Sequence, residues 1–301
     1  MAEKALSTMT VKILVTGAPG NVGTEVVKAL RGKAPFRIGA YHLETARQTL
    51  GGDQEYVQFD FLDPSTFTPT FSGIEKIFLI RPPALAKVKR DIAPALYAAK
   101  QAGVKHIVFL SIQGVDKNRV VPHYKIEQLI IELGFTYIFL RGSFFMQNLS
   151  TTHQADIRDK SEIALPVGKA RTSFIDVRDI ATIAAKMLLQ PGDENMIYTL
   201  TGSEALDYYQ VADQLTASLG RPIHYTHPSI LKFVRQQLTE GRKLSMTLVM
   251  AALYTITRFG NAQEVTSDVQ NILGRSPILF EQFLHDYRSC WLPIKQAKLE
   301  I

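Results

Sequence analysis

Three glycines stand where an apolar run gives way to an amphipathic pattern. Gly17, Gly20 and Gly23 lie in "VTGAPGNVG". Between a strand and a helix, this spacing allows a tight turn, lets backbone N–H groups approach a pyrophosphate, and permits close helix–strand packing. The anion then lies at the helix N-terminus, where unpaired N–H groups favour negative charge. This turn is therefore predicted to bind a dinucleotide through Gly17, Pro19, Gly20, Asn21, Val22 and Gly23.

The end of the second expected strand, residues 36–42, bears on which dinucleotide binds. NAD-specific sites carry an Asp or Glu there for the ribose hydroxyls. Here Tyr41 and His42 end the strand, Glu44 follows two residues later, and Arg47 lies about one helical turn beyond. Neutral or cationic groups suit a 2′-phosphate. We predict NADP(H) in preference to NAD(H), with His42 and Arg47 near that phosphate.

Alternating strand and helix patterns must position these residues. Strands are predicted at residues 11–17, 36–42, 56–61, 74–80, 104–111 and 135–142. Helices are predicted at 21–32, 43–51, 87–103 and 124–134. Several strands are continuous apolar runs, which indicates burial on both faces of a parallel sheet flanked by helices.

The pattern changes after residue 142. A hairpin is predicted at 161–174, helices at 176–190 and 207–220, strands at 195–202 and 222–228, and a mostly helical stretch at 228–290. We expect a Rossmann-type, doubly wound parallel α/β domain over residues 1–150. Residues 151–301 are expected to form a smaller, mixed but mostly helical substrate-binding lobe packed on the first domain, with elements near 170–200 returning to the first domain.

Composition excludes several classes of protein. The 301 residues include one cysteine, Cys290, so no internal disulfide framework exists and a reducing compartment is expected. The first ten residues lack an apolar signal core, and the apolar stretch from Leu244 to Ile256 is shorter than the roughly 20 residues a membrane span needs. The net charge of +6 comes from scattered cations. We expect a soluble cytoplasmic protein without membrane, nucleic-acid or metal partners.

Longer motifs show a family resemblance. They are "LVTGAPGNVG", "FDFLDP", "FLS", "YIFLRGSFFMQN", "FIDVRDIA", "QVADQLTASLGRPIHY" and "FLHDYRSCW". With these motifs the chain resembles the NmrA-like atypical short-chain dehydrogenases/reductases over almost its whole length. Within that family it is most similar to the branch of the ergot-alkaloid (festuclavine and agroclavine) dehydrogenases, which reduce iminium intermediates with NADPH.

The resemblance implies roles for residues at strand ends. Asp60 and Phe61 would line the adenine end of the coenzyme. The phosphates and nicotinamide ribose would be bordered by Ile80, Arg81 and Pro82, and the nicotinamide by Ser111, Gly142, Ser143, Phe144 and Phe145. All of these follow the carboxyl ends of expected strands, where open α/β sheets bind ligands.

The chain departs from the Ser, Tyr-x-x-x-Lys pattern of typical short-chain dehydrogenases. Tyr124 precedes Lys125 directly, and neighbours on a helix point about 100° apart, so Tyr124 is expected to face solvent. Ser111 and Lys125 remain as the catalytic candidates that hold the nicotinamide ribose, although an ordinary exposed lysine fits Lys125 equally well. His123 is either a proton donor or a surface histidine at the helix start.

Without a dedicated acid, the chemistry favours acceptors that are already electron-poor. The predicted function is an NADPH-dependent oxidoreductase that transfers hydride to an imine or iminium, a quinone or a dye. Phe144, Phe145, Met250 and Tyr254 are the predicted substrate contacts, and Met246 and Phe259 are further pocket candidates. For the residues of the helical stretch, an ordinary core position is the alternative.

Two other functions remain open. The first is a non-catalytic NAD(P)-sensing regulator of NmrA type that acts through protein partners. The second, an epimerase on the same fold, is disfavoured by the missing tyrosine. The sequence does not define the substrate, the stereochemistry or the oligomeric state, and it is compatible with a homo-oligomer.

Overall fold

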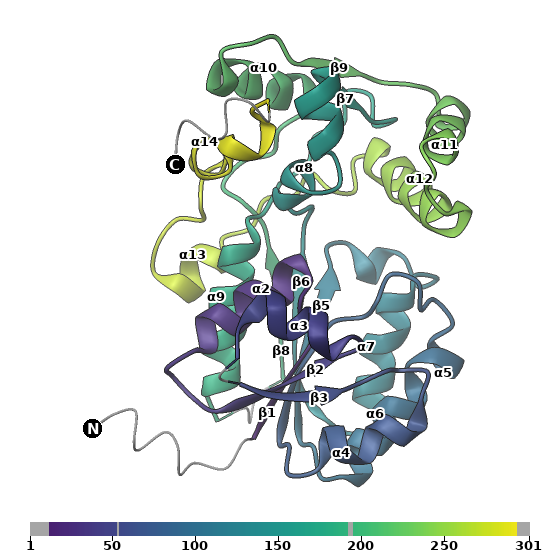
Figure 1. Cartoon of the computed structure of the whole chain (residues 1–301), viewed down its shortest axis with the longest axis vertical. Helices are drawn as coiled ribbons and strands as arrows, with labels where there is room; N and C mark the ends of the chain where they lie inside the picture. Colours follow the sequence, from purple (N-terminus) through teal and green to yellow (C-terminus); the bar gives the residue numbers. More distant parts are fainter. Residues whose placement is uncertain (1–11, 53, 192–194, 294–301) are drawn as a thin grey trace. The chain divides into compact units, whose positions relative to one another are not determined.

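A computed structural model describes residues 12–52, 54–191 and 195–293 of the chain (Figure 1). These residues divide into two compact units. The first comprises the chain up to Gly142 together with Val177–Thr199, and the second comprises Ser143–Asp176 and the chain from Leu200 onward.

A seven-stranded sheet forms the centre of the first unit, in the order β3-β2-β1-β4-β5-β6-β8. Neighbouring strands from β3 to β6 pair in parallel. The predicted doubly wound Rossmann-type sheet is therefore confirmed, since strand order reverses direction at β1. The strands are β1 (Ile13–Thr16), β2 (Phe36–Ala40), β3 (Glu55–Gln58), β4 (Lys76–Leu79), β5 (His106–Ile112), β6 (Thr136–Gly142) and β8 (Met196–Leu200).

Helices flank this sheet. Helix α2 packs against α9, while α4, α5, α6 and α7 surround a hydrophobic cluster that includes Leu14, Ile77 and Phe109 of the strands (Figure 1). The helical segments are α2 (Asn21–Leu30), α3 (Leu43–Leu50), η1 (Pro64–Thr66), α4 (Phe67–Phe71), α5 (Val88–Asp91), α6 (Ala93–Gln101), η2 (Val115–Lys117), α7 (Pro122–Glu132) and α9 (Val177–Leu189).

The single helix predicted at 87–103 is interrupted. Helix α5 ends at Asp91, and α6 starts at Ala93 with Pro94 in its first turn. Proline lacks an N–H and its ring clashes with the preceding turn of a helix, so the chain restarts a helix there instead of continuing one.

The second unit is mostly helical. Its hydrophobic core includes Phe174, Tyr208, Phe233, Phe283 and the fully buried Trp291. Its elements are α8 (Gln147–Ser150), the π-helix η3 (Asp156–Lys160), β7 (Glu162–Ala164), α10 (Tyr208–Leu219), β9 (His224–Thr226), α11 (Ile230–Thr239), α12 (Leu244–Arg258), α13 (Asp268–Leu273), α14 (Phe280–Asp286) and η4 (Arg288–Trp291). Among the described residues, no helix is long and apolar enough to span a bilayer.

The hairpin predicted at 161–174 is wrong. Strand β7 pairs in parallel with β9, more than fifty residues later in the chain. The predicted return arm forms no strand, and its Thr172 makes a single antiparallel bridge to Leu206. The turn after β7 is held instead by Tyr225 of β9, whose hydroxyl lies 3.0 Å from the Leu165 carbonyl oxygen and 3.1 Å from that of Gly168.

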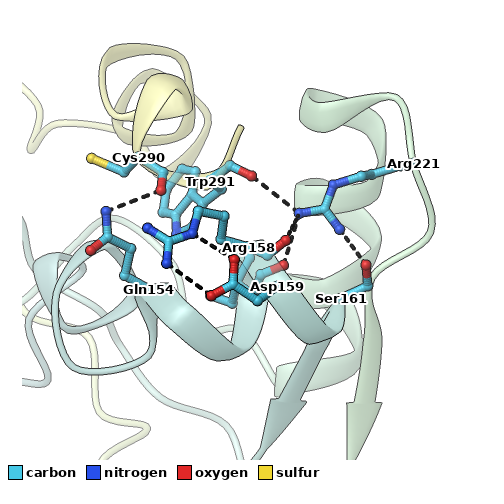
Figure 2. A network of polar contacts seen from close by, with 8 residues as sticks. Gln154, Arg158, Asp159, Ser161, Arg221, Cys290 and Trp291 are labelled. Atoms are coloured by element: carbon cyan, nitrogen blue, oxygen red, sulfur yellow. Dashed lines mark hydrogen bonds and ion pairs between the residues drawn. The ribbon is translucent and has the colours of Figure 1, made fainter. Parts of the chain in front are cut away.

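One arginine ties three segments of the second unit together (Figure 2). The Arg221 guanidinium donates to the Ser161 hydroxyl and to the carbonyls of Ile157 (2.8 Å), Arg158 (3.2 Å) and Trp291 (3.1 Å). The Trp291 indole in turn donates to the Leu149 carbonyl at 2.9 Å. These bonds fix the C-terminal turn η4 to the end of the π-helix.

Replacing Arg221 by methionine should therefore lower the free energy of unfolding by about 2–4 kcal/mol, because several buried carbonyls lose their donor. Denaturant unfolding measures this loss. The matched control is Arg158→Met, since the Arg158 ion pair with Asp159 is at the surface and such pairs contribute about 0–1 kcal/mol. Equal losses in the two variants would contradict the assignment.

Candidate functional site

The turn between β1 and α2 leaves no room for a side chain at Gly17 or at Gly23. Gly17 has φ of +75°, and a Cβ there would lie 2.6 Å from the Cβ of Ile80. A Cβ on Gly23 would lie 2.7 Å from the backbone of Gly17 and Ala18. Gly20 is the N-cap residue of α2, is solvent-exposed, and donates its N–H to the Gly17 carbonyl at 2.9 Å. The sequence therefore forms the tight strand-to-helix turn that an anion-binding site needs.

A cavity of about 370 Å³ opens beside this turn. It is lined by residues 17–20, by 39–42 and 45 at the end of β2 and start of α3, by 59–61 after β3, and by 82, 84 and 85 after β4. Its size falls within the usual range of ligand pockets. The cavity lies at the carboxyl ends of parallel strands, which is where α/β sheets bind nucleotides.

Asp60 and Phe61 both line the cavity, as the resemblance implies for the adenine end. Asp60 is held by a local turn: its carboxylate accepts the Leu62 N–H at 2.9 Å, and its own N–H donates to the Thr66 hydroxyl at 3.2 Å. Phe61 is buried and meets Phe59 edge to face, with ring centroids 4.6 Å apart.

Of the two residues predicted to lie near a 2′-phosphate, one lines the cavity and the other does not. His42 lines the cavity, with its ring against Tyr41. Arg47 does not line it, because its guanidinium carbon lies 4.9 Å over the ring of Tyr56, a cation–π contact. The structure therefore does not support Arg47 as a phosphate ligand. Thr45, which sequence reasoning missed, lines the cavity three residues after His42, the spacing that puts two helical residues on one face.

Of the three residues after β4 that the resemblance places near the phosphates, only one lines the cavity. Pro82 lines the cavity, and Ile80 packs beneath the glycine turn with its N–H bonded to the Thr16 hydroxyl at 2.9 Å. Arg81 is absent from the cavity lining. Its guanidinium donates instead to the carbonyls of Pro82, Pro83 and Leu85. Arg81 therefore does not line the cavity, although the resemblance implies that it borders the phosphates.

Ser111, which was predicted to hold the nicotinamide ribose, bonds to a side chain of the protein. Its hydroxyl is buried and donates to Glu127 of α7 at 2.6 Å. Arg141 of β6 donates to both oxygens of the same carboxylate, at 3.1 and 2.8 Å. The structure thus does not support Ser111 as a group that touches the nicotinamide ribose. Glu127 was missed, although a carboxylate between Ile126 and Ile130 on the buried face was a visible signal.

The other candidate residues lie at the start of α7 and differ in how deeply they are buried. Lys125 is exposed, whereas Ser111 is buried. Tyr124 is half-buried, although it was predicted to face solvent. His123 stacks on Phe109 with ring centroids 5.9 Å apart; burial, with the charge of Arg81 adding to it, lowers the pKa of His123 to about 3. His123 is therefore half-buried and carries no charge near neutral pH.

Two of the predicted substrate residues of the second unit are in aromatic contact. Phe144 stacks on Tyr254 with centroids 6.3 Å apart, and the Tyr254 hydroxyl lies 2.9 Å from Nε2 of His153. Met250 and Tyr254 are buried core residues, whereas Phe144 and Phe145 are half-buried.

The remaining predicted site residues near this unit have separate surroundings. Ser143 is buried, with its hydroxyl 3.1 Å from that of Ser173. Gly142 ends β6, and Met246 and Phe259 are exposed.

His153 makes the protein sensitive to acid. Burial lowers the pKa of His153 from 6.5 to about 4, so the unfolded chain binds more protons than the folded protein between those values. The contribution to stability is complete above pH 6.5 and is lost as the pH falls toward 4. We expect His153→Gln to reduce this acid-dependent loss by about 2–3 kcal/mol. Denaturant unfolding across this pH range tests it against His285→Gln, which removes an exposed histidine and should change nothing.

No group of three or more His, Cys, Asp or Glu side chains within residues 12–52, 54–191 and 195–293 could hold a metal ion.

Comparison with known proteins agrees with this geometry. The model of the NmrA-like family matches residues 9–284. The NAD(P)H azoreductase of Xenophilus azovorans is 33% identical over 276 residues, covering 90% of this chain and 96% of that protein. The agroclavine dehydrogenase of Claviceps fusiformis is 29% identical over 294 residues, covering 93% and 98%. An NADPH-dependent quinone oxidoreductase of Escherichia coli, solved with NADPH, shares the fold with a TM-score of 0.81 at 21% identity, covering 91% and 99%.

Proposed function

The chain belongs to the NmrA-like family, and on that premise we propose that it is an NADPH-dependent reductase of small, electron-poor organic molecules. The observation that carries the proposal is the cavity beside the glycine turn, whose walls come from the ends of β1, β2, β3 and β4. The similarity over nearly the whole chain to an azoreductase and to an agroclavine dehydrogenase supports an azo, iminium or related acceptor.

The cavity residues fit the coenzyme group by group. Backbone N–H groups at the start of α2 suit the pyrophosphate. Asp60 and Phe61 offer a carboxylate and an aromatic edge to the adenine, and His42 and Thr45 offer hydrogen-bond donors to a 2′-phosphate. No acidic residue lines the end of β2, and the Glu44 carboxylate is engaged by Gln48 at 3.0 Å. These features support NADPH over NADH. Bound NADPH supplies the hydride.

Acceptor binding is assigned to the second unit. Phe144 presents a half-buried aromatic ring that stacks on Tyr254, and the Tyr254 hydroxyl in turn lies 2.9 Å from Nε2 of His153. The proposal includes Phe145 as a second contact and treats Met250 and Tyr254 as its support. A flat conjugated acceptor stacks well on such a ring.

The proposed acceptors are ones that need no general acid, because the candidate proton donors of this chain are engaged or unsuited to that role. The Ser111 hydroxyl donates to Glu127, His123 is neutral, and Tyr124 has no lysine four residues later. Reduction of an unactivated ketone needs an acid to quench the developing alkoxide. An iminium, quinone or cationic dye does not, and catalysis then comes from positioning. Lys125 stays the proposed ribose contact.

Oxidation of NADPH against a panel of quinones, iminium salts, azo dyes and triarylmethane dyes tests the function. We expect turnover with at least one of these classes and none with simple ketones. Tight NADPH binding without turnover on the whole panel would instead favour the regulatory alternative, in which the bound dinucleotide changes the affinity for a protein partner.

The proposed function also implies which partners the protein binds and where in the cell it acts. A small organic acceptor is the expected partner, and the scattered cations give no reason to expect nucleic acid. A cytoplasmic location suits a chain with a single cysteine and a reaction that draws on NADPH. Sedimentation of the purified protein gives its oligomeric state.

A further inference from the structure

The loop after β4 forms one wall of the cavity, through Pro82, Ala84 and Leu85. We propose that Arg81 is a positioning residue that holds this wall by bracing the loop from within the protein and does not bind the coenzyme itself. The proposal rests on the dinucleotide site proposed above.

The Arg81 side chain is directed at the backbone of its own loop. Its Nη1 lies 2.9 Å from the Pro82 carbonyl oxygen, 3.0 Å from that of Pro83 and 3.1 Å from that of Leu85. Its Nε is buried and has no acceptor, and Arg81 forms no ion pair with a carboxylate of the described residues. The positive charge is therefore compensated by carbonyl dipoles of residues 82–85.

The loop needs such a donor because of its composition. Pro82 and Pro83 have no N–H, so the segment has few donors of its own. One internal bond closes it, from the Leu85 N–H to the Pro82 carbonyl at 3.0 Å. The guanidinium donates to the carbonyls of Pro82, Pro83 and Leu85 and fixes their directions, which orients the backbone that lines the cavity.

The surroundings of Arg81 fit a brace better than a phosphate ligand. His123 lies close enough for the Arg81 charge to contribute to its lowered pKa, and His123 is itself stacked on the buried Phe109. Burial also lowers the pKa of Arg81. A phosphate ligand would instead present its guanidinium to the cavity, where Arg81 is absent from the lining.

Two substitutions separate bracing from direct binding. Arg81→Lys keeps the charge but replaces the planar fork by a flexible point charge, and Arg81→Met removes both. Under the proposal each variant weakens NADPH binding by about ten-fold, because binding must then order the loop. The slope of affinity against salt stays that of the wild type, and kcat at saturating NADPH changes by less than about two-fold.

Hydrogen exchange gives a second readout. The Leu85 amide, which bonds Pro82, should exchange faster in both variants, whereas the amides of β4 should not. Lys89→Met is the matched control, since Lys89 is an exposed cation on the next helix, and it should leave affinity and exchange unchanged.

Three results would overturn the proposal: wild-type affinity in Arg81→Lys with a loss in Arg81→Met alone, a flattened salt dependence in Arg81→Met, or unchanged affinity in both variants. The first two would make Arg81 a direct phosphate ligand, and the third would remove any role of Arg81 in binding. If Arg81→Met does not fold, Arg81→Lys decides through its affinity and the Leu85 exchange. Gly20→Val is measured in the same series. If this variant binds NADPH normally, the cavity is not the dinucleotide site, and the proposed function fails rather than the role of Arg81.

Discussion

Replacing Glu127 by alanine is expected to lower the free energy of unfolding by about 3–5 kcal/mol. The Glu127 side chain is only 2% exposed and accepts from the Ser111 hydroxyl and from two nitrogens of Arg141. Without the carboxylate, the Arg141 guanidinium, 15% exposed, loses its buried counter-charge, and only Asp116 remains, at 3.6 Å. An uncompensated buried charge is one of the few single changes with so large an effect.

Denaturant unfolding of the purified variants measures this effect. Glu132→Ala is the matched control, because Glu132 is exposed on the same helix and should cost less than about 0.5 kcal/mol. The double variant Glu127→Leu, Arg141→Met should recover most of the loss, since an apolar pair replaces a buried ion pair at little cost. A loss near that of Glu132→Ala would mean that the carboxylate is solvated and that the interaction with Ser111 is incidental.

The glycine turn and the parallel sheet were predictable because their signals are local. Gly17, Gly20 and Gly23 stand within seven residues, and no side chain fits at Gly17 and Gly23 without a clash. Strands such as β1 and β5 are short apolar runs, and that pattern is created by burial on both faces. The position of the cavity then follows from strand order alone.

The errors have one physical cause, a partner distant in sequence. Ser111 was assigned to the ribose because its acceptor, Glu127, lies on the next helix and is recognised only when α7 packs on β5. Arg47 was assigned to a phosphate, although Tyr56 of β3 offers its ring to the guanidinium. The hairpin at 161–174 was predicted from local pattern, and β9 supplied a better partner for β7. Residue type alone indicates what a side chain can bind but not which neighbour the fold brings to it.

Arg81 shows the same limit at the candidate site. Its position after β4 was predictable, and the resemblance gave it a role at the phosphates. Its side chain is directed at the carbonyls of Pro82, Pro83 and Leu85 instead of at the cavity, and the residue type alone did not indicate this direction.

The largest functional effect is expected from Gly20→Val, which should weaken NADPH binding by more than about 100-fold, or roughly 2.7 kcal/mol. A Cβ at Gly20 would lie 2.9 Å from the Gly17 carbonyl oxygen, so the turn must shift, and the added methyl groups would occupy the edge of the cavity. Gly20 has φ of −69°, which valine adopts readily, and it is exposed, so the fold should survive.

Calorimetric titration of NADPH into the variant tests this, with thermal unfolding as the check on folding. The matched control is Gly52→Val: no atom lies within 4 Å of a Cβ built there, and Gly52 does not line the cavity. Because both variants add the same side chain to an exposed glycine, a loss of affinity in Gly20→Val alone isolates the anion-binding turn. Normal affinity in Gly20→Val would move the coenzyme away from α2, and the roles proposed for His42, Thr45, Asp60 and Phe61 would fall with it.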